Sequence, residues 1–272
     1  MQKRIALLYD FDYTLANGFM QEFGLMQDHG YNNVLDYFNA CDEVFQDKDD
    51  IDMCLSMMGG VLQMSWKKDR KVTREYLQSF GKDVKFYPGV ESWFDKINEI
   101  GKAKGYEIEH YIISSGLKEI IEGSSIYPKL KRVYANFFCY NKDGEAFWPC
   151  QVVNYTSKTQ YIFRVRKNVL DELGSLNKIN AKMNEEDMLP FENIIYLGDS
   201  QTDIPSFKVI KNSGGISICV YDGESEKARG VAEKCYKEGR VNFFLPADYR
   251  EGSELFELIK NYIERITEIQ ND

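Results

Sequence analysis

The sequence predicts an α/β fold: a doubly wound, mostly parallel sheet of the Rossmann-like type with helices on both faces. Short apolar runs of strand length recur along the chain, and segments with helical periodicity separate them. Strands that alternate with helices imply crossover connections, and therefore parallel neighbours in the sheet. The chain has 272 residues, of which 43% are hydrophobic, so it is long and apolar enough for a full core.

Five apolar runs predict buried strands, and Asp143-Gly144 between aromatic runs predicts a β-hairpin turn after the third of them. Helical periodicity marks the segments that connect or follow the strands. The predicted strands are 5–9 (IALLY), 108–114 (IEHYIIS), 132–140 (RVYANFFCY), 193–199 (NIIYLGD) and 215–221 (GISICVY). The predicted helices include 90–105, 161–179 and, at the end of the chain, 253–269.

One long stretch, residues 16–85, interrupts this alternation. It contains no convincing strand and is rich in Met and aromatic residues, which predicts a helical insert directly after the first strand. Two domains follow from this: an α/β core of residues 1–15 and 86–272, and a helical cap of residues 16–85. The Met and aromatic side chains predict a small helical core for the insert rather than a ligand-binding surface. They are Met53, Met57, Met58, Met64 and Trp66.

Composition excludes several classes of function. The formal net charge of −9 argues against nucleic acid as the main partner, although a bound cation could still attract a small anionic substrate. The six cysteines form no C-x-x-C pair, which indicates reduced thiols and a cytoplasmic protein without zinc. No apolar stretch is long enough to cross a bilayer, so no membrane partner is expected. Only two histidines are present, which weakens any mechanism built on a histidine base.

Polar residues follow the predicted strands at the points where these end. Because the carboxyl ends of parallel strands face one crevice, residues far apart in the sequence are expected to meet there. A lysine at the start of a helix, Lys158, is expected to join them. The strand-end residues are Asp10, Asp12 and Thr14 after the first strand, Ser114, Ser115 and Gly116 after the second, and Asp199 and Asp203 after the fourth.

Four carboxylates in one crevice would repel each other unless a cation lay among them. Oxygen ligands without His or Cys favour Mg²⁺, and such an ion beside a lysine and free amides would hold a phosphoryl group. Asp10 and Asp12 lie at i and i+2 and would face the same ligand, so one could attack phosphorus while the other handled a proton. Alternative interpretations remain: Asp199 and Asp203 as helix-capping acids, Ser114 as the cap of the next helix, and Lys158 as a solvated lysine.

Four segments, DFDYT, IISSG, the lysine of TSKTQ and GDSQTD, resemble the ordered motifs of the haloacid dehalogenase-like hydrolase superfamily. The D-x-D-x-T pattern is similar to its phosphatase branch, and the insert lies where phosphoserine phosphatase-like members place a helical cap. The resemblance implies that Asp10 is the nucleophile and a Mg²⁺ ligand, and that Asp12 is the general acid and base, with its main-chain oxygen on the metal. It also implies that Asp199 binds the metal directly and that Asp203 binds it through water or is the partner of Lys158. The residues implied to bind the phosphoryl group are Thr14, Ser114, Ser115, Gly116 and Lys158. Of the two serines, Ser114 is preferred.

The expected function is therefore Mg²⁺-dependent hydrolysis of a small phosphorylated metabolite through an aspartyl-phosphate. A phosphotransferase or mutase with the same intermediate and a non-enzymatic phosphate- or metal-binding module are the alternatives. Phe19 stands where phosphoserine phosphatases carry a substrate-binding Glu, and Glu22 is out of register, so phosphoserine is disfavoured.

Overall fold

The computed structural model describes residues 3–47, 49–171, 176–199 and 201–269. Their strands form one seven-stranded sheet with the order β4-β3-β2-β1-β5-β6-β7. β1 lies in the middle and is parallel to both β2 and β5. Only β3 and β4 pair antiparallel. The chain thus builds outward from β1 on one side and then returns to build on the other, which confirms the doubly wound α/β fold.

The five predicted strands are all present, and the turn at Asp143-Gly144 joins β3 to β4 as predicted. Gly144 has φ +75°, a conformation that favours glycine. Two details differ from the prediction. β2 continues past Ser114 to Leu117 with a register shift after Ile113, and a short edge strand, β7, was not predicted. The strands are β1 Arg4–Tyr9, β2 Glu107–Leu117, β3 Arg132–Tyr140, β4 Ala146–Gln151, β5 Ile194–Gly198, β6 Ile216–Tyr221 and β7 Phe243–Pro246.

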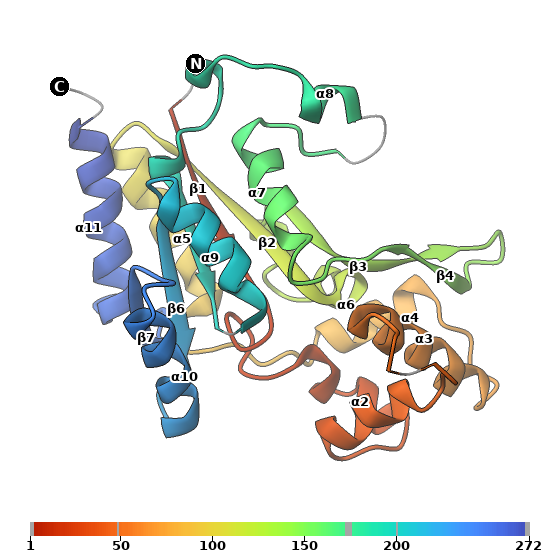
Figure 1. The fold of residues 1–272 in the computed structure, drawn as a ribbon. Coiled ribbons are helices and arrows are strands. Elements are labelled where there is room, and N and C mark those ends of the chain that lie inside the picture. The colour runs from red at the N-terminus through yellow and green to blue at the C-terminus, as the bar shows by residue number, and fades with distance from the viewer. Residues whose placement is uncertain (1–2, 48, 172–175, 200, 270–272) are drawn as a thin grey trace.

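Helices cover both faces of the sheet (Figure 1). Successive residues of β1 point to opposite faces of the sheet and are buried on both. Leu7 packs in a hydrophobic cluster with residues of α5 and α11, and Leu8 packs in another with residues of α7, α9 and α10. In the described residues no helix combines the length and the apolar character needed to cross a bilayer. The helices of the core are α5 Val90–Ala103, α6 Lys118–Glu122, α7 Lys158–Arg166, α8 Leu176–Asn180, α9 Ile204–Asn212, α10 Glu226–Lys237 and α11 Glu254–Ile269.

The single helix predicted for 161–179 is wrong. α7 ends at Arg166, and Asn168 has φ +53°, a left-handed conformation that Asn tolerates better than most residues. The amide of Val169 then donates to the carbonyl of Arg164 at 2.9 Å, which closes the helix end. Part of the predicted helix, 172–175, lies outside the described residues. The left-handed backbone conformation of Asn168 therefore ended the helix, although the apolar periodicity continues beyond it.

Between Ala16 and Lys85 the described residues form helices and turns and no named strand, as predicted. These helices lie beyond the carboxyl ends of the strands (Figure 1). Met57, Met58 and Met64 are buried, whereas Met53 is 60% and Trp66 39% exposed, so the predicted helical core includes only part of the set. The helices of this segment are α1 Leu25–Asp28, α2 Val34–Asp42, α3 Met53–Trp66 and α4 Arg74–Gly81.

Candidate active site

Asp10 and Lys158 form a buried ion pair at the carboxyl end of β1. Asp10 is the first residue after β1, and its amide donates to the carbonyl of Leu197 at 2.9 Å, which ties it to β5. Lys158 is the first residue of α7, is fully buried, and places Nζ 2.8 Å from Oδ2 of Asp10. The interpretation of Lys158 as a solvated lysine is therefore wrong.

Lys158 also contacts the acid that follows β5. Its Nζ lies 2.8 Å from Oδ1 of Asp203, which also accepts a hydrogen bond of 2.8 Å from the hydroxyl of Tyr196. Asp203 is the residue before α9, yet its side chain makes no capping bond to that helix. Its other oxygen instead accepts from the amide of Asp199 at 3.3 Å. Gly198 permits this approach, because a Cβ there would lie 2.5 Å from Cγ of Asp203.

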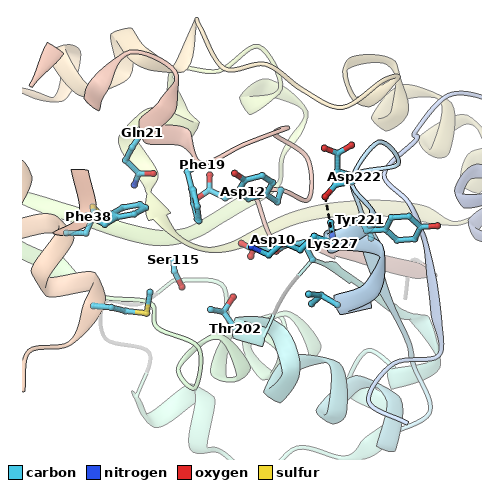
Figure 2. Close-up of a pocket in the computed structure, with 18 of the residues that line it drawn as sticks. Asp10, Asp12, Phe19, Gln21, Phe38, Ser115, Thr202, Tyr221, Asp222 and Lys227 are labelled. Atoms are coloured by element: carbon cyan, nitrogen blue, oxygen red, sulfur yellow. Dashed lines mark hydrogen bonds between the residues drawn. The ribbon is translucent and has the colours of Figure 1, made fainter. Parts of the chain in front are cut away.

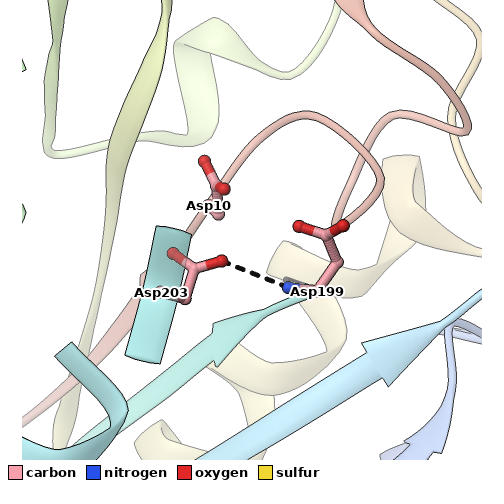
Figure 3. Close-up of side chains that lie close together, drawn as sticks. All are labelled: Asp10, Asp199 and Asp203. Atoms are coloured by element: carbon pink, nitrogen blue, oxygen red, sulfur yellow. Dashed lines mark hydrogen bonds between the residues drawn. The ribbon is translucent and has the colours of Figure 1, made fainter. Parts of the chain in front are cut away.

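Three carboxylates come together at this point. Asp10, Asp199 and Asp203 each offer an oxygen within 4.8 Å of the others (Figure 3). Burial raises the pKa of Asp10 to about 6 despite the nearby Lys158. For Lys158, burial alone would lower the pKa, but the charges of Asp10 and Asp203 raise it well above its usual range. The ammonium group of Lys158 thus contacts two of the three acids, and the all-oxygen donor set fits a hard divalent cation such as Mg²⁺.

Asp12 lies beside this cluster and differs from it in charge. Burial, and secondly the charge of Asp10, raise the pKa of Asp12 to about 8, so the neutral acid predominates at pH 7. Its Oδ1 accepts a hydrogen bond of 2.8 Å from the amide of Met20. Its other oxygen is close to β2: a Cβ on Gly116 would lie 3.3 Å from Oδ2 of Asp12 and would collide with Met20. Glycine at this position therefore lets the chain after β1 approach β2.

The hydroxyl groups are not all placed as predicted. Ser114 is buried, and its Oγ accepts from the amide of Gly116 at 3.0 Å, so this amide is already used. Ser114 does not cap α6, whose N-cap position is Leu117. Ser115 lines the pocket, and its Oγ has no hydrogen-bond partner in the described part of the chain. Thr14 is fully buried outside the pocket lining. Of the two serines, Ser115 is therefore the one that lines the pocket.

Asp10, Asp12 and Asp199 line a pocket of about 680 Å³, whereas Asp203 is buried behind them. The pocket extends from Asp10 and Asp12 between the helical segment and the core (Figure 2). Several of its residues were not singled out from the sequence, because only their tertiary neighbours distinguish them from ordinary core positions. They include Gln21 and Phe38 from the helical segment, and Thr202, Tyr221 and Lys227 from the core. Met53 and Met57, which were predicted as helical core rather than ligand-binding surface, also line the pocket.

Solved structures with a similar arrangement of elements include phosphatases and a related hydrolase. A substrate-bound phosphoserine phosphatase superimposes with a TM-score of 0.53 at 17% identity, over 96% of this chain and 99% of that one. A HAD family hydrolase from Salmonella enterica serovar Typhi gives a TM-score of 0.54 at 14% identity, over 93% of this chain and 69% of that one. The fold is therefore that of the haloacid dehalogenase-like phosphatases, as the motifs predicted.

No family model matches the chain. At the level of sequence, an uncharacterized protein of Borreliella burgdorferi (strain B31) is 31% identical over 208 residues, which cover 69% of this chain and 70% of that protein. The chain belongs to the same family as this Borreliella protein.

Proposed function

We propose that the protein is a Mg²⁺-dependent phosphomonoester hydrolase that forms an aspartyl-phosphate on Asp10. The observation that carries the proposal is the fully buried Lys158, which holds Asp10 and Asp203 within a group of three carboxylates, two of which, Asp10 and Asp199, line a pocket. Such a group is costly to bury and is typical of a site that binds a metal ion and a phosphoryl group. The similar structures include phosphoserine phosphatase, which supports a phosphomonoester as substrate.

Asp10, Asp199 and Asp203 would hold the Mg²⁺, which would supply positive charge to neutralise the phosphoryl oxygens. Asp10 is positioned for attack because its two oxygens are fixed by Lys158 and by the amide of Phe11, at 2.8 and 2.7 Å. One oxygen forms a bond to phosphorus while the bond to the leaving oxygen breaks. Asp12, whose pKa burial raises to about 8, would give its proton to that oxygen.

The second half of the reaction reverses these roles. Water attacks the phosphorus of the aspartyl-phosphate, the bond to Asp10 breaks, and Asp12 takes the proton of the water. Residues 16–85 would act as a cap that excludes bulk water and contacts the leaving group, while residues 1–15 and 86–272 form the catalytic core.

The test is hydrolysis of p-nitrophenyl phosphate with Mg²⁺ by the wild type and by Asp10→Asn. We expect a loss of about 10⁴-fold or more in kcat for the variant, with an unchanged far-UV circular dichroism spectrum. Release of p-nitrophenol that needs an added alcohol and yields the alkyl phosphate in place of free phosphate would instead favour a phosphotransferase. A wild type that binds Mg²⁺ but turns over no phosphomonoester would favour a binding module.

A further inference from the structure

The end of the pocket that lies in the helical segment has its own chemistry. Here the lining comes from Phe19, Gln21 and Phe38, together with Met53 and Met57. Figure 2 shows the first three on one side of Asp10 and Asp12, while Tyr221, Asp222 and Lys227 lie on the other side. A leaving group that extends from the phosphoryl position into this end would meet mainly apolar surface.

Three aromatic rings form a continuous row along this surface. The centroids of Tyr13 and Phe19 are 4.9 Å apart and those of Phe19 and Phe38 are 5.3 Å apart, both edge to face. All three side chains are only partly buried, so their rings have surface free to contact a ligand. Rings held in this way by their neighbours present a rigid apolar surface, which suits an aromatic group.

Gln21 adds one polar group to this surface. The residue is 2% exposed, and its Oε1 is buried without a hydrogen-bond partner among the described residues. In Figure 2 its amide end points towards the space beside Phe19 and Phe38. An unsatisfied buried carbonyl oxygen is destabilising, and a ligand N–H or O–H group would satisfy it.

Charge disfavours an anionic leaving group at this end. Lys227 is the one lysine among the described lining residues outside the catalytic group, and it belongs to α10 on the other side of the acids. The charged side chain at the cap end is Asp42, which accepts a hydrogen bond from Ser56. Glu22, three residues after the expected amine-binding position, does not line the pocket, and its Oε2 accepts from the amide of Phe19 at 2.8 Å and the hydroxyl of Tyr13 at 3.3 Å.

From these observations we infer that Phe19, Phe38 and Gln21 bind the leaving group, and that the substrate is a phosphomonoester of an aromatic alcohol that has no negative charge and whose ring carries a hydrogen-bond donor. The aromatic rings hold the substrate ring, and Oε1 of Gln21 accepts from its donor. The inference rests on the proposed function for the reaction itself, but the binding site can be tested without turnover.

The test uses two phosphate esters that differ by one donor: 4-hydroxyphenethyl phosphate and 4-methoxyphenethyl phosphate. We expect the wild type to prefer the hydroxyl compound in kcat/KM by about tenfold, the effect of one hydrogen bond to a buried group. Gln21→Leu removes the acceptor at similar volume and should abolish or reverse this preference. Gln63→Leu, on the exposed side of α3, is the matched control and should keep it.

Calorimetric binding of the corresponding phosphonates, in which a methylene group replaces the ester oxygen, separates this inference from the proposed function. The same tenfold preference in Kd, lost in Gln21→Leu, would support the leaving-group site even if no ester were hydrolysed. Equal Kd and equal kcat/KM for the two compounds would overturn it while leaving the hydrolase intact. A higher kcat/KM for phosphocholine or 3-phosphoglycerate than for the hydroxyl compound would also overturn it.

Discussion

The Nζ atom of Lys158 and the Oδ2 atom of Asp10 lie 2.8 Å apart, although 148 positions separate the two residues in the sequence (158 − 10). Lys158 is fully buried, so this contact and the one with Asp203 provide its charge with partners in place of water. Replacing a buried ionic partner leaves the other charges uncompensated, which is the basis of the first prediction.

Lys158→Met should lower the free energy of unfolding by about 3–5 kcal/mol in the absence of metal, because Asp10 and Asp203 would then repel each other without a counter-charge. Urea unfolding followed by circular dichroism measures this. Adding Asp203→Asn to Lys158→Met should recover part of the loss, since one of the buried charges disappears. Lys208→Met on the exposed side of α9 is the control. Equal stability of Lys158→Met and Lys208→Met would contradict the buried ion pair.

Asp12→Asn should slow esters of poor leaving groups more than esters of good ones. An alkoxide needs the proton of Asp12 to leave, whereas p-nitrophenolate does not. We expect kcat/KM for benzyl phosphate to fall by about 10²–10⁴-fold and that for p-nitrophenyl phosphate to fall clearly less. Steady-state kinetics with both esters measure the ratio. A uniform loss for both would exclude Asp12 as the acid of the first step.

Ser115→Ala and Ser114→Ala should differ in the property they change. Ser115 lines the pocket and its hydroxyl has no hydrogen-bond partner among the described residues, so its loss should raise KM for a phosphate ester by about tenfold. Ser114→Ala leaves the amide of Gly116 without its acceptor and should cost about 1 kcal/mol of stability. Kinetics and thermal unfolding of both variants test this. The opposite outcome would return the phosphoryl-binding role to Ser114, as the motif suggests.

Mg²⁺ should stabilise the folded protein because it relieves the repulsion among Asp10, Asp199 and Asp203. At a concentration 100 times Kd the gain should be about 2.7 kcal/mol, seen as a higher Tm in a calorimetric scan. Removal of the ion with EDTA should abolish activity and leave the far-UV spectrum unchanged. Asp199→Asn should keep the fold and lose most of the Tm shift. An equal shift in this variant would place the ion elsewhere.

Stability should fall in mild acid because of a buried histidine in the helical segment. His29 is hydrogen-bonded to Tyr37 at 3.1 Å and Ser65 at 2.9 Å, and burial lowers its pKa from 6.5 to about 4. The unfolded chain therefore binds a proton first, and the stabilising effect of neutral His29 is complete above pH 6.5 and lost as the pH falls towards 4.

Urea unfolding of the wild type and His29→Gln between pH 7 and pH 4.5 measures this contribution. The wild type should lose more stability than the variant over this range. His110, whose pKa burial lowers to about 3, is present in both proteins and cancels in the comparison. Parallel pH dependence of the two proteins would show that His29 does not titrate as inferred.

The fold was largely predictable because its signals are local. Each strand of the centre of the sheet is an apolar run, and the alternation with helices leaves few topologies. The errors occurred where local signals conflict or are weak. Asn168 ends α7 inside a periodic segment, and β7 is a short edge strand that pairs with β6 alone.

The sequence by itself determined which acids would meet, because residues that follow parallel strands converge at one edge of the sheet whatever the details of packing. Lys158 begins α7, after the antiparallel strand β4, so this convergence does not account for its contacts with Asp10 and Asp203. Tertiary structure decided the rest. Whether Ser114 or Ser115 faces the pocket depends on the register of β2 after its bulge, and a shift of one residue reverses the direction of a side chain. Gln21 Oε1 lacks a hydrogen-bond partner among the described residues, beside aromatic rings, because of how helices from distant parts of the segment pack. The burial of such a side chain cannot be predicted from the order of residues.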